Sequence, residues 1–169
     1  MNFFFFLLKF LPVFMLSVLL ANHCEAQTTK WYKGNLHTHS YWSDGDEFPE
    51  MIMNWYKKQG YDFVALSDHN ILPEGEKWKT IPQDPVFLAG FQEYLDQYGK
   101  DWVEYKKDTA GIHVKLKTLE EFRSLFEEEE EFMIFRAEEV TAYLEDKAIH
   151  MGAINIQELI MPRGGNTVR

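Results

Sequence analysis

The chain has little cysteine and a shortage of basic residues: one cysteine, Cys24, and 17 Lys and Arg against 27 Asp and Glu. Because Cys24 lies in an N-terminal stretch that we expect to be removed, the mature chain has no thiol for catalysis, disulfides or metal binding. The formal net charge of −10 argues against a surface that grips the phosphates of a nucleic-acid duplex. An anionic substrate therefore needs a local source of positive charge, and bound metal ions are such a source.

Residues 1–26 are typical of a secretory signal peptide. A short, weakly basic start precedes a long apolar run, and small residues end at Ala26, where cleavage is expected. The mature chain, residues 27–169, would then be secreted or periplasmic, without stable membrane association. Two alternatives stay open. Residues 3–20 approach the ~20 apolar residues of a membrane span, so the segment is a possible retained anchor; lipid modification of Cys24 is the other.

Strand-like and helix-like patterns alternate along the mature chain. Strands are expected over residues 31–36, 61–66, 112–117, 132–136 and 148–156. Helices are expected from Pro49 to Gly60, after Asp84-Pro85, and from a capping box at residues 118–121. The first helix joins two strands, and such a βαβ unit implies a parallel sheet and an α/β fold. The acidic run at residues 127–131 is most simply a solvated turn.

Three histidines and a glutamate follow these strands. His37 and His39 are two positions apart, so in an extended segment both imidazoles point to one side and reach one cation. His69 follows the next strand, and the carboxyl ends of parallel strands line one crevice. Glu139 follows a third strand, and its carboxylate can bridge two cations. Imidazole and carboxylate ligands suit divalent ions, which activate water for hydrolysis.

The same residues lie in motifs that resemble those of the PHP (polymerase and histidinol phosphatase) superfamily. Gly-Asn-Leu-His-Thr-His-Ser at residues 34–40, followed by Ser-Asp-Gly at 43–45, resembles the first motif. Leu-Ser-Asp-His-Asn at 66–70 looks like the second, and Ala-Glu-Glu-Val-Thr at 137–141 is similar to the third. Ile-His-Met-Gly at 149–152 resembles the following strand, where many members carry a further histidine ligand. Together the motifs extend the resemblance over about residues 31–168.

The resemblance implies a fold and a set of ligands. The fold would be the first part of a distorted (β/α)7 barrel, with two or three divalent ions (Zn, Mn or Fe) at the carboxyl ends of its strands. His37 and His39 would bind the first ion. Glu139 would bridge it to a second, which His150 would also bind, and His69 would bind a third.

The resemblance gives other polar residues supporting roles. Asp44 would be a ligand of the third ion or lie just behind its ligands, and Asp68 would orient its neighbours. Simpler interpretations stay open for two of these positions: Asp44 forms only an Asx-turn, or His150 is a buried strand histidine. His113 matches no motif and is taken as structural.

The chain also departs from the family pattern. Ala137 replaces the usual glycine, and no histidine, aspartate or cysteine follows His150, so the later ligands of the family are absent. We therefore expect the N-terminal portion of a larger protein, the alternative being a degenerate copy. The implied function is hydrolysis of small phosphate esters, as a phosphatase or phosphodiesterase, with metal-activated water. The alternative is a non-catalytic metal-binding or interaction module.

Overall fold

The computed structural model describes residues 29–163, so the predicted signal peptide lies outside the described residues. The elements belong to a compact unit that begins at Tyr32. In chain order they are β1 (Gly34–Asn35), α2 (Pro49–Lys58), β2 (Phe63–Leu66), β3 (Trp78–Ile81), α3 (Pro85–Tyr98), β4 (Tyr105–Asp108), β5 (Gly111–Lys115), α4 (Leu119–Phe126), β6 (Met133–Leu144) and β7 (Lys147–Ile154). Every helix within residues 29–163 is too short or too polar to span a bilayer.

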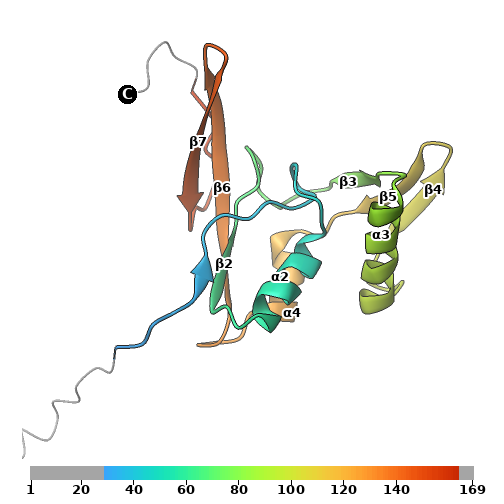
Figure 1. Ribbon diagram of the computed structural model, residues 1–169, viewed down its shortest axis with the longest axis horizontal. Helices are drawn as coiled ribbons and strands as arrows, with labels where there is room; N and C mark the ends of the chain where they lie inside the picture. The colour runs from blue at the N-terminus through green and yellow to red at the C-terminus, as the bar shows by residue number, and fades with distance from the viewer. Residues whose placement is uncertain (1–28, 164–169) are drawn as a thin grey trace, which may run out of the picture. The chain divides into compact units, whose positions relative to one another are not determined.

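Four strands form a mixed, curled sheet in the order β1-β2-β6-β7 (Figure 1). β1 is parallel to β2, and β2 is parallel to β6, which confirms the predicted parallel arrangement. β7 runs antiparallel to β6 as the second arm of a hairpin. The chain therefore has an α/β fold whose larger sheet is a half-barrel, and residues 29–163 do not close it into a full barrel.

Helices α2 and α4 cover one face of this sheet. Met53 of α2 and Phe122 of α4 are fully buried against Ile134 of β6 and the apolar residues of β2. The predicted capping box starts α4: Thr118 Oγ1 accepts from the Glu121 amide, and the Glu121 carboxylate accepts from the Thr118 amide. The two helices therefore pack on one face of the parallel strands, and the other face of the sheet is not covered by a helix of residues 29–163.

A second, antiparallel sheet has the order β3-β5-β4 and shares a separate core with α3. Sequence patterns predicted β5 and α3, including the hydrogen bond from the Val86 amide to the cap residue Asp84. They missed β3 and β4, because these short strands carry polar and charged residues without apolar alternation. Strand β4 is instead stabilised by its hairpin with β5. In the turn of this hairpin the Asp108 carboxylate accepts a hydrogen bond from the Ala110 amide.

Strand β6 is longer than the sequence predicts. The expected strand over residues 132–136 is only its first part, where it pairs with β2 as far as Arg136. The second part continues to Leu144 because β7 replaces β2 as its partner. Glu139 therefore lies within β6 and not beyond its end, at the level where the segment after β2 reaches His69.

The acidic run at residues 127–131 forms the turn between α4 and β6, as expected. Glu127 accepts a hydrogen bond from the Ile134 amide and pairs with Arg123, and Glu128 pairs with Lys57. The other three carboxylates are exposed to solvent, where water satisfies their charge.

A fully buried carboxyl group, that of Glu50, lies where α2 meets α3 and the segment after it. Its Oε1 accepts hydrogen bonds from Tyr94 Oη at 2.7 Å and Trp102 Nε1 at 2.9 Å. Burial raises the pKa of Glu50 because it penalises the carboxylate more than the two hydrogen bonds favour it. The folded protein therefore binds this proton more tightly than the unfolded chain does.

We predict that Glu50→Gln becomes relatively more stable as the pH rises. Wild-type stability from this group is fully present below the unfolded pKa, about 4.3, and is lost as the pH rises through the higher folded pKa. Glutamine cannot ionise, so its free energy of unfolding relative to wild type should increase between pH 5 and pH 8, measured by urea denaturation. Glu129→Gln, at an exposed position, is the control. An equal difference at both pH values would contradict the prediction.

Candidate metal centre

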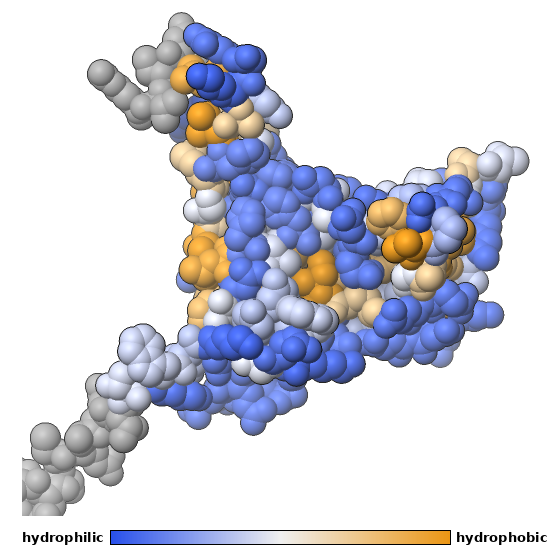
Figure 2. Space-filling view, viewed as in Figure 1, coloured by the Kyte–Doolittle hydropathy of each residue, from blue (hydrophilic) through white to orange (hydrophobic). Residues whose placement is uncertain are grey.

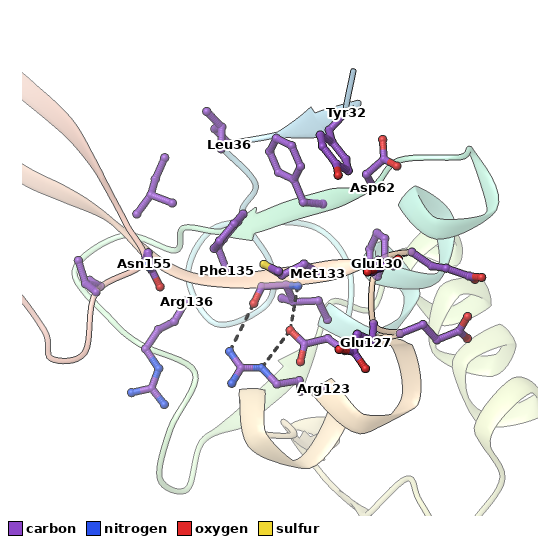
Figure 3. A pocket seen from close by; sticks show the side chains of 18 of the residues that line it. Tyr32, Leu36, Asp62, Arg123, Glu127, Glu130, Met133, Phe135, Arg136 and Asn155 are labelled. Atoms are coloured by element: carbon purple, nitrogen blue, oxygen red, sulfur yellow. Dashed lines mark hydrogen bonds and ion pairs between the residues drawn. The ribbon is translucent and has the colours of Figure 1, made fainter. Parts of the chain in front are cut away.

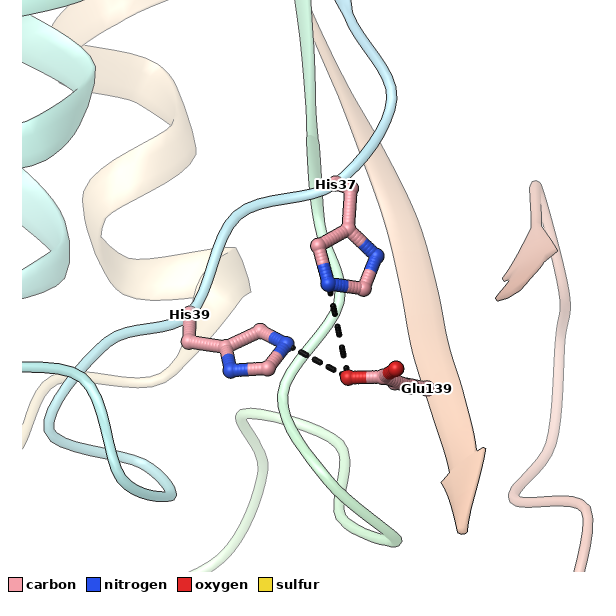
Figure 4. Close-up of side chains that lie close together, drawn as sticks. All are labelled: His37, His39 and Glu139. Carbon is pink, nitrogen blue, oxygen red and sulfur yellow. Dashed lines mark ion pairs between the residues drawn. The ribbon is translucent and has the colours of Figure 1, made fainter. Parts of the chain in front are cut away.

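The segment that follows β1 presents two histidines to one carboxylate. Figure 4 shows His37 and His39 pointing at the side chain of Glu139. His37 Nε2 lies 3.4 Å and His39 Nε2 2.8 Å from Glu139 Oε2. The expected projection of both rings to one side is thus observed. Asn35 steadies the segment, because its Nδ2 contacts the His37 carbonyl and the hydroxyl of Tyr56.

A tight turn brings Asp44 to the same site. The Ser40 carbonyl accepts hydrogen bonds from the amides of Ser43 and Gly45, both at 3.0 Å. The turn places Asp44 Oδ1 2.8 Å from His39 Nδ1 and Asp44 Oδ2 3.4 Å from His69 Nε2. Burial slightly opposes ionisation, but the hydrogen bond with His39 and the nearby histidines hold the pKa of Asp44 below its usual value.

The carboxylate of Asp68 stabilises this turn through hydrogen bonds. It is fully buried, and its carboxylate accepts from the Ser40 amide and hydroxyl, both at 2.8 Å, and from the Ser43 hydroxyl at 2.6 Å. Burial raises the pKa of Asp68, although these three hydrogen bonds act in the opposite direction. Asp68 contacts the serines on both sides of the turn and so helps to fix the loop that carries Asp44.

Two further histidines approach Glu139 from β7 and from the segment after β2. His150 Nδ1 lies 3.1 Å from Glu139 Oε1, and His69 Nδ1 lies 3.3 Å from Glu139 Oε2. The His150 side chain is 42% exposed, so it is not the buried strand histidine of the simpler interpretation. The Glu139 side chain is only 9% exposed and is contacted by four imidazoles.

These residues fit divalent metal ions. They form three overlapping groups, His37-His39-Glu139, His39-Asp44-His69 and His69-Glu139-His150, in each of which one ligand atom per residue lies within 4.8 Å of the others. Bonds of 2.0–2.1 Å in a tetrahedral site put ligand atoms about 3.3 Å apart, close to the separations observed. Nitrogen and carboxylate oxygen donors are those that zinc, iron and manganese accept. All six predicted ligands are thus brought together in groups that could hold a metal ion.

Two residues near the centre lie within the predicted motifs at 66–70 and 137–141 but were given no role of their own from the sequence. Thr141 and Asn70 each follow a predicted ligand closely, yet a polar residue at a strand end is ordinary. Only the folded chain reveals that the Thr141 hydroxyl contacts His69 and His150. His113 lies apart from the centre, in the small sheet, where it contacts Thr80 and Asp108, in line with a structural role.

Comparisons of the chain with models of protein families, with curated proteins and with solved structures found no match.

We predict that Gly45→Ala destabilises the protein through the Asp44 turn. A Cβ at this position would lie 2.5 Å from the Ser40 amide nitrogen and 2.6 Å from the His39 carbonyl carbon, so the backbone must move. The expected loss is about 1–3 kcal/mol in the free energy of unfolding. Gly90→Ala is the matched control, because its Cβ meets only Glu47 Oε2, at 3.7 Å, and alanine in a helix should stabilise by about 1 kcal/mol. Equal effects of the two substitutions in urea denaturation would refute the prediction.

Proposed function

We propose that the chain is the metal-binding portion of an exported phosphoesterase of the PHP type, which hydrolyses small phosphate esters. The observation that carries this proposal is the convergence of four histidines from three chain segments on the buried carboxylate of Glu139. A buried carboxylate contacted by four imidazoles, two of which also contact Asp44, offers the nitrogen and oxygen donors that divalent cations accept. The half-barrel of parallel strands is compatible with the first part of a distorted (β/α)7 barrel.

The proposed roles follow the contacts. His37 and His39 hold one divalent ion together with Glu139, and Glu139 shares its carboxylate with the group that contains His150. His69 and Asp44 form the third group with His39. When bound, such ions lower the pKa of water toward ~7 and neutralise charge on the phosphoryl oxygens. The chain itself contributes the fixed positions of these ligands.

The substrate we propose is a small phosphorylated molecule. His37 is 53% exposed, so the site is open to solvent on its side. The net charge of −10 makes the surface as a whole repel polyanions, and attraction is confined to the metal centre. A nucleic-acid duplex is therefore disfavoured, because it needs many separate phosphate contacts. Export through the predicted signal peptide, residues 1–26, would place the activity outside the cytoplasm.

We predict that Glu139→Gln abolishes metal binding and hydrolysis together. The amide is nearly isosteric but has no negative charge to hold two ions. Loss of activity should exceed about 100-fold, since even residues behind metal ligands account for roughly 10- to 100-fold. The measurements are metal content per chain after loading with Zn²⁺ or Mn²⁺, and hydrolysis of p-nitrophenyl phosphate and bis-p-nitrophenyl phosphate by the full chain.

His113→Ala is the control, because this histidine lies in the small sheet and belongs to none of the three candidate groups. It should leave metal content and hydrolysis unchanged. The proposal fails if wild type retains no metal, or if His113→Ala lowers hydrolysis as much as Glu139→Gln does.

A specific surface favours the second candidate, a non-catalytic metal-binding or interaction module. A groove of about 1140 Å³ lies along the larger sheet (Figure 3). It is lined by residues of β2, β6 and α4 and by the acidic turn at 127–131, with no histidine among them. Leu36, Met133 and Ile154 are exposed there, and Figure 2 shows apolar residues along this side of the sheet. Such a face invites association. Metal bound at full stoichiometry without hydrolysis of either ester would favour this module over the enzyme.

A further inference from the structure

The hydroxyl of Thr141 lies between two of the candidate ligands. Thr141 is two residues after Glu139 in β6, so both side chains project from the same face of the strand. Its Oγ1 is 2.6 Å from His69 Nδ1, 3.1 Å from His150 Nδ1 and 3.2 Å from the carbonyl oxygen of Glu139. A single oxygen thus contacts two imidazoles that come from different segments of the chain.

The capacity of a hydroxyl group limits how these contacts can be made. A threonine hydroxyl donates one hydrogen bond and accepts two. When its proton points to the Glu139 carbonyl, which can only accept, the hydroxyl oxygen accepts from Nδ1–H of His69 and Nδ1–H of His150. In this tautomer each ring keeps its lone pair on Nε2.

Nearby charges favour the same arrangement. His69 Nδ1 and His150 Nδ1 lie 3.3 Å and 3.1 Å from the oxygens of the Glu139 carboxylate, which can accept a hydrogen bond from an Nδ1–H group. His69 Nε2 instead faces Asp44 Oδ2 at 3.4 Å, so these two atoms could bind one cation. Metal-ligating histidines typically donate their other ring nitrogen to such a partner, which fixes the tautomer and the direction of the ring.

Asn70 in turn fixes Thr141. Its Nδ2 donates to the Thr141 carbonyl at 2.9 Å, and its Oδ1 accepts from the Thr141 amide at 2.8 Å. The side-chain amide therefore pairs with β6 as a neighbouring strand would, beyond Arg136, where pairing with β2 has ended. Asn70 has a φ of 50°, a left-handed conformation that asparagine tolerates better than most residues. Since His69 precedes Asn70, this clamp also sets the distance from His69 to β6.

We propose that Thr141 and Asn70 are positioning residues of the metal centre. Thr141 holds His69 and His150 through their Nδ1 atoms, which leaves His69 Nε2 facing Asp44, and Asn70 holds Thr141 in place. This inference rests on the proposed metal-binding function and adds the groups that orient its histidines. It assigns to Thr141 a role that its sequence context does not disclose.

The test compares Thr141→Val with Thr141→Ser. Valine keeps the shape and the strand preference of threonine but removes the hydroxyl, whereas serine retains it. We expect Thr141→Val to weaken Zn²⁺ binding by roughly 10- to 100-fold and Thr141→Ser to stay close to wild type, measured by calorimetric titration of the full chain with Zn²⁺ against a competing chelator. Thr80→Val is the matched control, because Thr80 Oγ1 contacts His113 Nδ1 at 2.9 Å away from the centre.

A second measurement reads the tautomers directly and needs no metal. Nitrogen-15 NMR of the zinc-free protein should show His69 and His150 protonated at Nδ1 in wild type and Thr141→Ser, and a mixture of tautomers in Thr141→Val. If wild type binds no Zn²⁺ but shows these tautomers, the proposed function fails while the role of Thr141 in orienting the rings stands. If wild type binds Zn²⁺ and Thr141→Val binds it equally, the inference is overturned and the proposed function is not.

Asn70→Gly provides an independent test if Thr141→Val does not fold. Glycine adopts a φ of 50° without strain, so this variant removes the amide clamp but not the backbone conformation. We expect it to weaken Zn²⁺ binding by about 10-fold with thermal unfolding still cooperative. Unchanged Zn²⁺ affinity in folded Asn70→Gly would overturn the role of the clamp.

Discussion

Strand β2 pairs in parallel with β1 on one side and with β6 on the other, and the candidate metal centre depends on this arrangement. Parallel pairing brings the carboxyl ends of strands that are distant in the sequence to one edge. The segment with His37 and His39 follows β1, His69 follows β2, and Glu139 lies at the same level of β6. A change of register by one residue between β2 and β6 would turn Glu139 away from His37, His39 and His69.

Glu139 is the carboxylate that all four histidines of the centre contact. Its side chain is almost completely buried, and its four neighbours are imidazoles. Asp44 adds a second carboxylate to a chain that already has a net charge of −10. Divalent cations would compensate both carboxylates and accept the nitrogen lone pairs. Bound cations would therefore give this acidic surface one local site of positive charge.

The small sheet and α3 support the centre indirectly. The turn that carries Asp44 is flanked by Trp42 and Phe48, which are buried in the core shared with α3. Trp42 is held further by a hydrogen bond from its Nε1 to the Lys117 carbonyl and by one from Lys77 Nζ to its own carbonyl. The turn in the first predicted motif is therefore anchored by Trp42 and Phe48, two residues to which the motif comparison gave no role.

Several structural features of this protein could be predicted from its sequence. Two histidines spaced for one face, the parallel βαβ unit and the capping box of α4 follow from local periodicity and hydrogen bonding, so they could be predicted without coordinates. The length of β6, the polar strands β3 and β4 and the contacts of Thr141 could not. Each depends on pairing that the local pattern does not show: β7 folds back on β6 and extends it, and β5 pairs with both β3 and β4. His69, His150 and Thr141 come from three separate segments, and their contacts form only in the folded chain. The sequence by itself determined which side chains can bind a cation, and the tertiary structure decided which atoms of those side chains face one another.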